Sequence, residues 1–226
     1  MEFVPFILFF LVFAGVAMYF GARAAKKRRE ALTAWGNSHG MTFSQGRDGS
    51  LDERFPNFKR LQSGSNRYGH NFIEGDWQGH NFFGFDYHYE TYSTDSKGRR
   101  QTNHHHFSAI VFGSKVPLKY LVIRPEGMFD KVKDFFGYDD INFESAEFSK
   151  KFHVTAEDKK WAYDVLHARA MEFLLGKTRY TIQFDRNEVY IFRGGKFKPE
   201  QFDEAANIVH GLLSQLPDYV VQQQQG

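Results

Sequence analysis

Residues 70–92, HNFIEGDWQGHNFFGFDYHYETY, decide the fold, because apolar and polar side chains alternate on both sides of a turn candidate, Gln78-Gly79. Successive side chains of a strand point to opposite faces of a sheet, so alternation with a period of two is typical of a strand. The stretch therefore predicts a β-hairpin with strands over 70–77 and 80–92. The second strand carries aromatic residues on one face and polar residues on the other: Phe83, Phe85, Tyr87 and Tyr89 against Asp86, His88 and Glu90.

Two more strands are expected directly after the hairpin. A polar loop over 93–103 leads into HHHFSAIVFG (104–113), and KYLVIRP (119–125) follows. Parallel neighbours would need a long crossover between each pair of strands, whereas these connections are short or polar. We therefore expect an antiparallel sheet.

The second half of the chain mixes helices and strands. Its periodicities and turn residues predict a helix over 125–137, strands over 141–144 and 150–155, a helix over 156–175, a hairpin over 179–193 that turns at Arg186-Asn187, and a helix over 199–216. Propensity leaves open whether the helix over 156–175 breaks near His167. The predicted fold class is α+β, with a mainly antiparallel sheet whose apolar face is covered by the helices over 156–175 and 199–216.

The segment before the hairpin is rich in Gly, Ser, Asn and Asp over 44–69, which favours loops. Four apolar side chains within it are expected to dock on the domain: Leu51, Phe55, Phe58 and Leu61. The chain is thus predicted to divide into a membrane anchor with its basic stop (1–29), a helix continuation with an ordered surface segment (30–69), an α+β domain (70–217) and a frayed polar tail (218–226).

The chain begins with an uncharged apolar run of twenty residues. Twenty helical residues at about 1.5 Å each span roughly the 30 Å hydrocarbon layer of a membrane. A cleaved signal peptide would instead need a positive stretch before a shorter apolar core, and only Met1 and Glu2 precede the run. A retained transmembrane helix is therefore predicted, formed by Phe3, Val4, Pro5, Phe6, Ile7, Leu8, Phe9, Phe10, Leu11, Val12, Phe13, Ala14, Gly15, Val16, Ala17, Met18, Tyr19, Phe20, Gly21 and Ala22.

A cationic collar follows the apolar run and consists of Arg23, Lys26, Lys27, Arg28 and Arg29. An excess of Lys and Arg marks the cytoplasmic end of a transmembrane helix, which predicts an N-terminus outside and a domain in the cytoplasm. Bases beside a membrane also attract anionic lipid. The collar is therefore predicted to set topology and to contact lipid headgroups.

The charge of the chain is concentrated in this collar. Of 29 Lys and Arg and 27 Asp and Glu, the collar holds five bases and residues 1–22 one acid, which leaves 24 bases against 26 acids. The domain lacks the positive field that nucleic-acid binding uses, so no nucleic-acid partner is expected. Its 26 Phe and 11 Tyr favour a buried core over disorder.

Imidazole and carboxylate side chains gather near the second strand of the hairpin. If the loop over 93–103 joins antiparallel strands, Glu90 lies opposite about His106, and His88, Glu90, His104 and His106 share one face. Such a set could hold zinc or another divalent ion. The same alternation is typical of a solvated outer face of an antiparallel sheet, which is the commoner arrangement, so both interpretations stay open.

No recognised catalytic motif is present: the chain has no Cys, G-x-S-x-G, G-x-G-x-x-G, P-loop or H-E-x-x-H sequence. Catalytic residues are therefore unknown, and no cofactor is predicted beyond the divalent metal. The function expected is binding or scaffolding at the membrane surface, with the bilayer and another membrane protein as partners. A metal-assisted hydrolase and a lipid-handling domain are the alternatives.

Three stretches carry a resemblance: FDYHYETYSTDSKGRRQTNHHHFSAIVF (85–112), LVIRPEG (121–127) and FESAEFSKKFHVTAEDKKWAYDVLHARAMEFLL (143–175). In this order the chain resembles a family of bacterial, single-pass membrane-anchored proteins of unknown function. The shared pattern is aromatic and aliphatic, so it implies a fold more than a reaction. The resemblance also implies a bacterial plasma membrane as the location.

Overall fold

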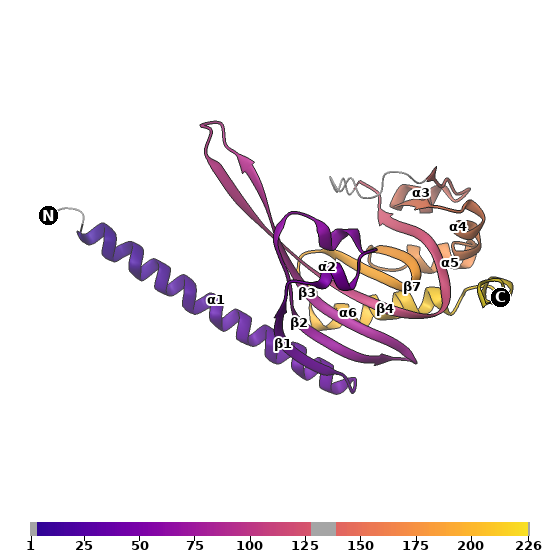
Figure 1. The fold of residues 1–226 in the computed structure, drawn as a ribbon, viewed down its shortest axis with the longest axis horizontal. Coiled ribbons are helices and arrows are strands. Elements are labelled where there is room, and N and C mark those ends of the chain that lie inside the picture. Colours follow the sequence, from indigo (N-terminus) through magenta and orange to yellow (C-terminus); the bar gives the residue numbers. More distant parts are fainter. Residues whose placement is uncertain (1–3, 128–138, 226) are drawn as a thin grey trace.

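The computed structural model describes residues 4–127 and 139–225, which form an α+β fold built on one seven-stranded sheet (Figure 1). Its strands are β1 (Thr42–Asp48), β2 (Ser65–Trp77), β3 (His80–Thr94), β4 (Arg100–Pro125), β5 (Asp139–Asp140), β6 (Phe152–Ala156) and β7 (Thr181–Gly194). The order is β1-β2-β3-β4-β6-β5, with β7 paired to the other edge of β4, and every strand pair is antiparallel. The α+β class and the antiparallel sheet are confirmed.

The helices are α1 (Val4–Ser38), α2 (Leu51–Arg54), η1 (Lys59–Gln62), α3 (Ala146–Lys151), α4 (Lys159–Val165), α5 (Ala168–Leu175), α6 (Pro199–Leu213) and α7 (Asp218–Gln225). The break near His167 is present, because the His167 side chain caps α5 by accepting a hydrogen bond from the Ala170 amide at 3.4 Å. The helix predicted over 125–137 lies largely outside the described residues.

The β2–β3 hairpin turns where the alternation predicts it, although β2 begins at Ser65, inside the segment that was expected to be loop. Trp77 pairs with His80, and the two turn residues, Gln78 and Gly79, have φ angles of 53° and 83°. Positive φ at both central positions is the signature of a type I′ turn, which matches the twist of the flanking strands. The Asp76 carboxylate accepts the Gly79 amide at 2.7 Å and closes the turn.

Strands β4 and β7 differ from the prediction. The two strands expected over 104–113 and 119–125 are one long strand, β4, and the hairpin expected at Arg186-Asn187 is one strand, β7. β7 follows β4 from Ser108 to Ile123, with irregular register between Gly113 and Leu121. Arg186 has a φ of 54°, so the residues that resemble a turn make a kink in a continuing strand.

Three short segments also correct the prediction. Residues 42–48 form β1 although the region was expected to be loop, because an exposed edge strand shows no clear apolar alternation. No strand lies over 141–144; the short β5 precedes it at Asp139–Asp140. The tail expected to fray forms α7, because Val220 is buried in the core.

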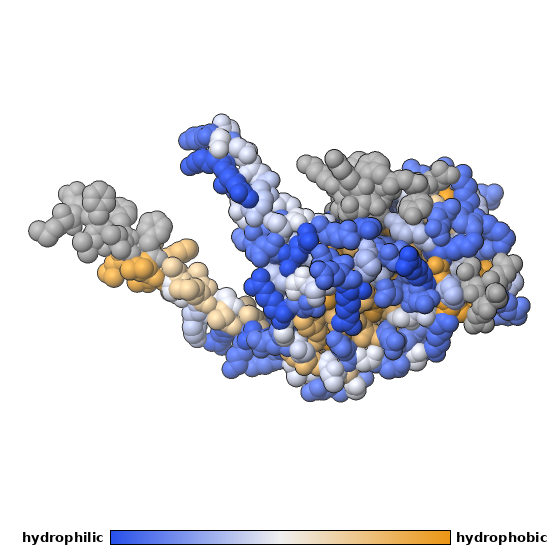
Figure 2. Space-filling view, in the orientation of Figure 1, coloured by the Kyte–Doolittle hydropathy of each residue, from blue (hydrophilic) through white to orange (hydrophobic). Residues whose placement is uncertain are grey.

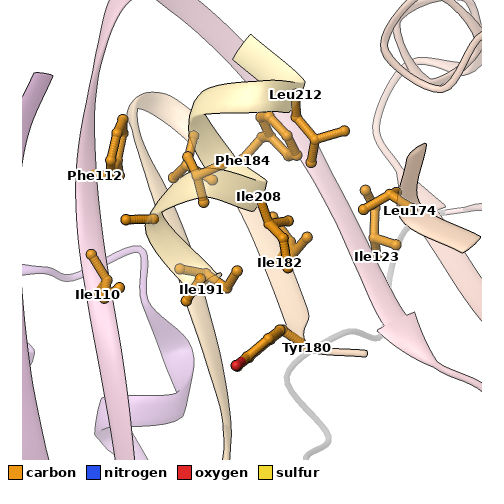
Figure 3. Packing of buried hydrophobic residues seen from close by; sticks show 14 of the residues in the cluster. Ile110, Phe112, Ile123, Leu174, Tyr180, Ile182, Phe184, Ile191, Ile208 and Leu212 are labelled. Carbon is orange, nitrogen blue, oxygen red and sulfur yellow. The ribbon is translucent and has the colours of Figure 1, made fainter. Parts of the chain in front are cut away.

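Both faces of the sheet are buried, which the alternation did not reveal. One face packs against α1, α4, α5, α6 and α7, and Figure 3 shows Ile208 and Leu212 of α6 beside strand residues such as Ile182 and Phe184. The other face holds the predicted aromatic stripe, but Leu51, Phe55, Phe58 and Leu61 cover it instead of the predicted helices. The four predicted docking points are therefore confirmed, whereas the position of the helices over the aromatic stripe is wrong.

Helix α1 is a single helix of 35 residues with two unlike parts. From Leu8 to Lys27 every described side chain is exposed, whereas Leu32 and Trp35 are buried against the sheet. Figures 1 and 2 show the exposed part projecting from the domain, with hydrophobic residues toward its N-terminal end. The helix thus runs through the boundary predicted at residue 29 without interruption.

Among the residues that the structure describes, no helix combines the length and the apolarity needed to cross a membrane.

Candidate functional site

The sheet face under α1 carries a buried ion pair. The Arg28 guanidinium donates from Nε to Asp86 Oδ2 at 2.8 Å and from Nη2 to Asp86 Oδ1 at 2.6 Å. The Asp86 side chain has no exposed surface, and that of Arg28 is 20% exposed. A bidentate pair of this geometry fixes both position and angle, so it locks α1 onto β3.

The remaining hydrogen-bonding capacity of the pair is also used. The Ser108 hydroxyl donates to Asp86 Oδ1 at 2.5 Å, and the Asn71 amide donates to Oδ2 at 2.9 Å. Arg28 Nη1 donates to the Phe197 carbonyl at 2.7 Å. The network therefore ties α1, β2, β3, β4 and the segment after β7 to one carboxylate.

Burial by itself would raise the pKa of Asp86. The hydrogen bonds and positive charge of Arg28, with the hydrogen bonds of Ser108 and Asn71, outweigh it and hold the pKa below its usual value. Asp86 is therefore ionised at neutral pH, as a partner of Arg28 must be.

This position corrects the predicted role of Arg28. Its side chain was expected at lipid headgroups with the rest of the cationic collar, but it points into the domain because Asp86 is its partner. The other four collar bases do not share this site: Arg23, Lys26 and Lys27 are exposed and Arg29 is half-buried. The expectation of a solvated polar face is likewise wrong for Asp86 and His88, which are both buried.

Three of the four predicted metal-ligating residues converge. The register pairs Glu90 with His104 and His88 with His106, two residues away from the pairing expected from the sequence. A shift of two residues keeps every side chain on its face, so the prediction of a shared face holds. One ligand atom from each of His88, Glu90 and His104 lies within 4.8 Å of the other two. His106 stands beside this group, with its ring centroid 4.9 Å from that of His88.

Asn66 orients two of these side chains. Its backbone carbonyl lies 3.1 Å from His88 Nδ1, and its side-chain amide donates to Glu90 Oε1 at 2.6 Å. A carbonyl can only accept, so His88 carries its proton on Nδ1 and presents the lone pair of Nε2 to His104. The hydrogen bond from the Asn66 side-chain amide is the main reason that the pKa of Glu90 lies below its usual value.

Beyond this cluster β3 and β4 continue as a two-stranded extension, here called the ribbon (residues 90–104). Among the described strands, β2 pairs with β3 only as far as Glu90 and β7 with β4 only as far as Ser108. Figure 1 shows the ribbon and the exposed part of α1 leaving the domain on the same side, and Figure 2 shows the ribbon tip as hydrophilic. Tyr92, 47% exposed, lies under the Arg100 guanidinium at 3.6 Å.

A hollow of about 580 Å³ lies beside α1 and is lined by Lys26, Arg29, Glu30, Thr33, Phe43 and Gln45, among others. Most of its lining residues are polar or charged in type, whereas a lipid-handling domain would be expected to show a continuous apolar groove here. A second hollow, of about 450 Å³, includes Arg54, Phe55, Asn81, Phe83 and Glu188 in its lining. Neither hollow is lined by His88, Glu90 or His104.

No family model matches the chain, and no curated protein matches it. A solved structure with a similar fold is the mycobacterial trehalose monomycolate transport factor A, TtfA, with a TM-score of 0.60. The two sequences are 16% identical, and the match covers 84% of this chain and 96% of that chain. At this identity the likeness shows the α+β fold alone.

Sequence reasoning missed Asp86, Ser108 and Asn66 as site residues. Asp86 carried one signal, since it is a carboxylate in the middle of a strand and directly between two aromatic residues, Phe85 and Tyr87. Nothing in the sequence around Asn66 marks it as a site residue, because its role depends on a φ of 47° and on two partners more than twenty residues away.

Proposed function

We propose that this chain is a single-pass membrane protein that crosses with its whole apolar run, residues 3–22, which begins before the described residues, and that its domain binds at the membrane surface in a fixed orientation. The observation that carries the proposal is the continuity of α1, which leads from an exposed apolar part straight into the part held by Arg28 and Asp86. A contiguous exposed apolar surface of this kind marks an interaction site for a membrane or a protein.

The exposed side chains favour a bilayer as the environment of this part of α1. Leu8, Leu11, Phe13, Met18 and Phe20 are each more than half exposed. They surround the helix and do not form one stripe. Apolar side chains all round are the pattern of a helix in lipid, whereas a helix that packs on a partner has them along one face. The cationic collar then favours a domain on the cytoplasmic side of the membrane. The membrane proposed is the plasma membrane of a bacterium.

The ribbon is the element proposed to touch the membrane surface. It projects on the same side as the exposed part of α1, and its tip combines Lys97, Arg99 and Arg100 with the exposed Tyr92. Amphipathic tyrosine and basic side chains favour the headgroup region, each base contributing about 1 kcal/mol near an anionic surface. A rigid α1 junction would hold the ribbon at that surface.

Alkaline carbonate extraction of membranes from cells that express the full chain tests the anchor. We expect the chain to stay in the pellet and the double variant Leu11→Arg, Val16→Arg to be released, because each central Arg costs roughly 2.5–3.5 kcal/mol of insertion free energy. The matched control is Ala25→Arg with Ala31→Arg, which adds the same charge at exposed positions after the apolar run. Release of the unaltered chain would overturn the anchor.

The absence of cysteine allows a separate test of the ribbon. A fluorophore on Ser96→Cys at the exposed tip should be quenched by headgroup-labelled quencher lipid when the full chain is reconstituted in anionic vesicles. The same fluorophore on Lys150→Cys, which is exposed on α3 at the far side of the domain, should not be. Equal quenching at both positions, or none at Ser96, would leave the anchor standing and remove the ribbon contact.

Lipid handling is a second candidate, favoured by the fold shared with a trehalose monomycolate transport factor. A domain held at the bilayer by α1 would be placed to bind an amphiphile there. Co-purification of the full chain from membranes, followed by mass spectrometry of bound lipid, tests it against a single-pass control protein of similar size. A lipid profile identical to that of the control would reject this candidate.

A further inference from the structure

We propose that a divalent transition-metal ion of the zinc class binds at the root of the ribbon, coordinated by His88 Nε2, His104 Nδ1 and a Glu90 carboxylate oxygen. The three residues come from neighbouring strands and lie together in the structure. The site is independent of the membrane anchor.

The distances fit a small tetrahedral ion. His88 Nε2 lies 3.2 Å from His104 Nδ1, and His104 Nδ1 lies 3.4 Å from Glu90 Oε1. Ligand atoms 2.0–2.1 Å from zinc at tetrahedral angles lie roughly 3.3 Å from one another. Two of the three ligand separations therefore match a zinc site, and the third, between His88 and the Glu90 carboxylate, is within 4.8 Å.

The shell behind the ligands is also of the kind that metal sites use. A metal-binding histidine usually donates its second ring N–H to a carbonyl or carboxylate, which fixes the tautomer and the ring orientation. His88 does this through Asn66 O, and the Asn66 amide orients the Glu90 carboxylate. One residue thus positions two ligands of different type.

The chemistry of the set selects the ion. Two imidazoles and one carboxylate suit zinc, nickel or copper far better than calcium or magnesium, which prefer oxygen ligands. The fourth corner would be water, because His104 opens to solvent with 59% of its side chain exposed. Three protein ligands with one exchangeable position are also the pattern of catalytic zinc sites, although the hollows described above lie elsewhere.

The run His104-His105-His106 could chelate metal in an unfolded chain, so the test must separate it from the folded site. In a strand, His105 points to the face opposite His104, and here it lies 2.8 Å from Thr91 Oγ1 and stacks on Tyr89. His105→Ala is therefore the matched control: it removes one histidine from the run and none from the site.

Isothermal titration of Zn²⁺ into the full chain in detergent micelles tests the proposal. We expect one ion per chain, loss of binding in His88→Ala with His104→Ala, and unchanged binding in His105→Ala. Asn66→Gly keeps the carbonyl and tolerates positive φ but lacks the amide, so it should weaken affinity about 10- to 100-fold. Zn²⁺ should also raise the melting temperature of the unaltered chain and of His105→Ala, and it should not raise that of His88→Ala with His104→Ala.

The single variant His104→Ala removes one metal ligand. Because the His104 side chain is exposed, loss of fold would not explain a loss of binding in this variant. An unaltered chain without zinc binding would overturn the site, since the 3.2 Å contact would then be only a hydrogen bond between two imidazoles. Equal affinity in His104→Ala and the unaltered chain would overturn it too, and so would loss of binding in His105→Ala.

Discussion

Arg28 and Asp86, which are 58 residues apart in the sequence, are joined by two parallel hydrogen bonds of 2.8 and 2.6 Å. The pair connects α1, whose first part projects from the domain, to the central part of the sheet. Removal of one member would leave the other charge buried and without its main partner.

The first prediction concerns this pair. Arg28→Ala should lower the free energy of unfolding by about 3–5 kcal/mol, because Asp86 would stay buried without its counter-charge. Urea unfolding in micelles measures the change, and Lys27→Ala, at an exposed neighbouring position, should change it by less than about 0.5 kcal/mol. The double variant Arg28→Met, Asp86→Leu should recover much of the loss, since it removes both charges. A single variant as stable as the unaltered chain would contradict the structural role of the pair.

A second prediction concerns the aromatic face of the sheet. Phe58 is fully buried and stacks on Tyr190 with ring centroids 4.7 Å apart. Phe58→Ala should cost about 3–5 kcal/mol of stability, because it leaves a cavity under the segment that covers this face. Glu53→Ala changes an exposed residue of the same segment and serves as the control in the same unfolding assay. Equal stabilities would mean that the segment only rests on the surface.

Gly64 provides a third prediction through its contact with Glu90. A Cβ at Gly64 would lie 2.2 Å from the Glu90 carbonyl oxygen, and the φ angle there is +67°. Gly64→Ala should therefore combine backbone strain, on the order of 1–3 kcal/mol, with a clash against β3. Gly98→Ala has a similar φ of +76° and open space around it, so it carries the strain alone. Thermal melts of the two variants should differ by the cost of the clash, with Gly64→Ala the less stable.

The fourth prediction is a dependence of stability on pH through His70. Burial lowers the pKa of His70 to about 4, against a smaller opposite effect of the Asp86 carboxylate. Lys196, His106 and Arg28 lower it further. A histidine that stays neutral in the fold but titrates near 6.5 when unfolded binds more protons in the unfolded state between these values. Stability should therefore decrease as the pH falls from about 6.5 to about 4.

Urea unfolding at pH 7 and pH 5 measures this dependence. His70→Gln should show a smaller loss between the two pH values than the unaltered chain, because it removes one group that takes up a proton on unfolding. An identical loss in both proteins would show that other groups set the pH dependence.

The parts of the fold that could be predicted are those fixed by local sequence. The β2–β3 hairpin follows from alternation around Gln78-Gly79, and the helix over 199–216 is present as α6 over Pro199–Leu213 because its apolar residues recur with helical spacing. The single strand β7 could not be predicted, since Arg186-Asn187 resembles a turn unless the path of β4 is known. Pairing over such distances is a property of the whole sheet and not of either segment.

The candidate metal cluster shows the same division. Alternation along β3 places His88 and Glu90 on one face, and a register error of two residues did not disturb that placement. Which face the helices cover was beyond a single sequence, because both faces of this sheet are apolar. Arg28 was misassigned for a related reason: a base beside an apolar run satisfies the charge pattern of a membrane protein whether it faces lipid or a distant carboxylate.

Because α1 is uninterrupted, the number of residues between its apolar part and Arg28 sets the rotation of the domain about the helix axis. Each residue of an α-helix advances about 100° around the axis and about 1.5 Å along it. One inserted alanine after Lys26 would therefore turn the domain by roughly a quarter of a revolution about the helix, while four would nearly restore the original heading at greater height. If the ribbon must meet the bilayer, insertions that restore the original rotation should keep this contact, and insertions that do not restore it should lose the contact.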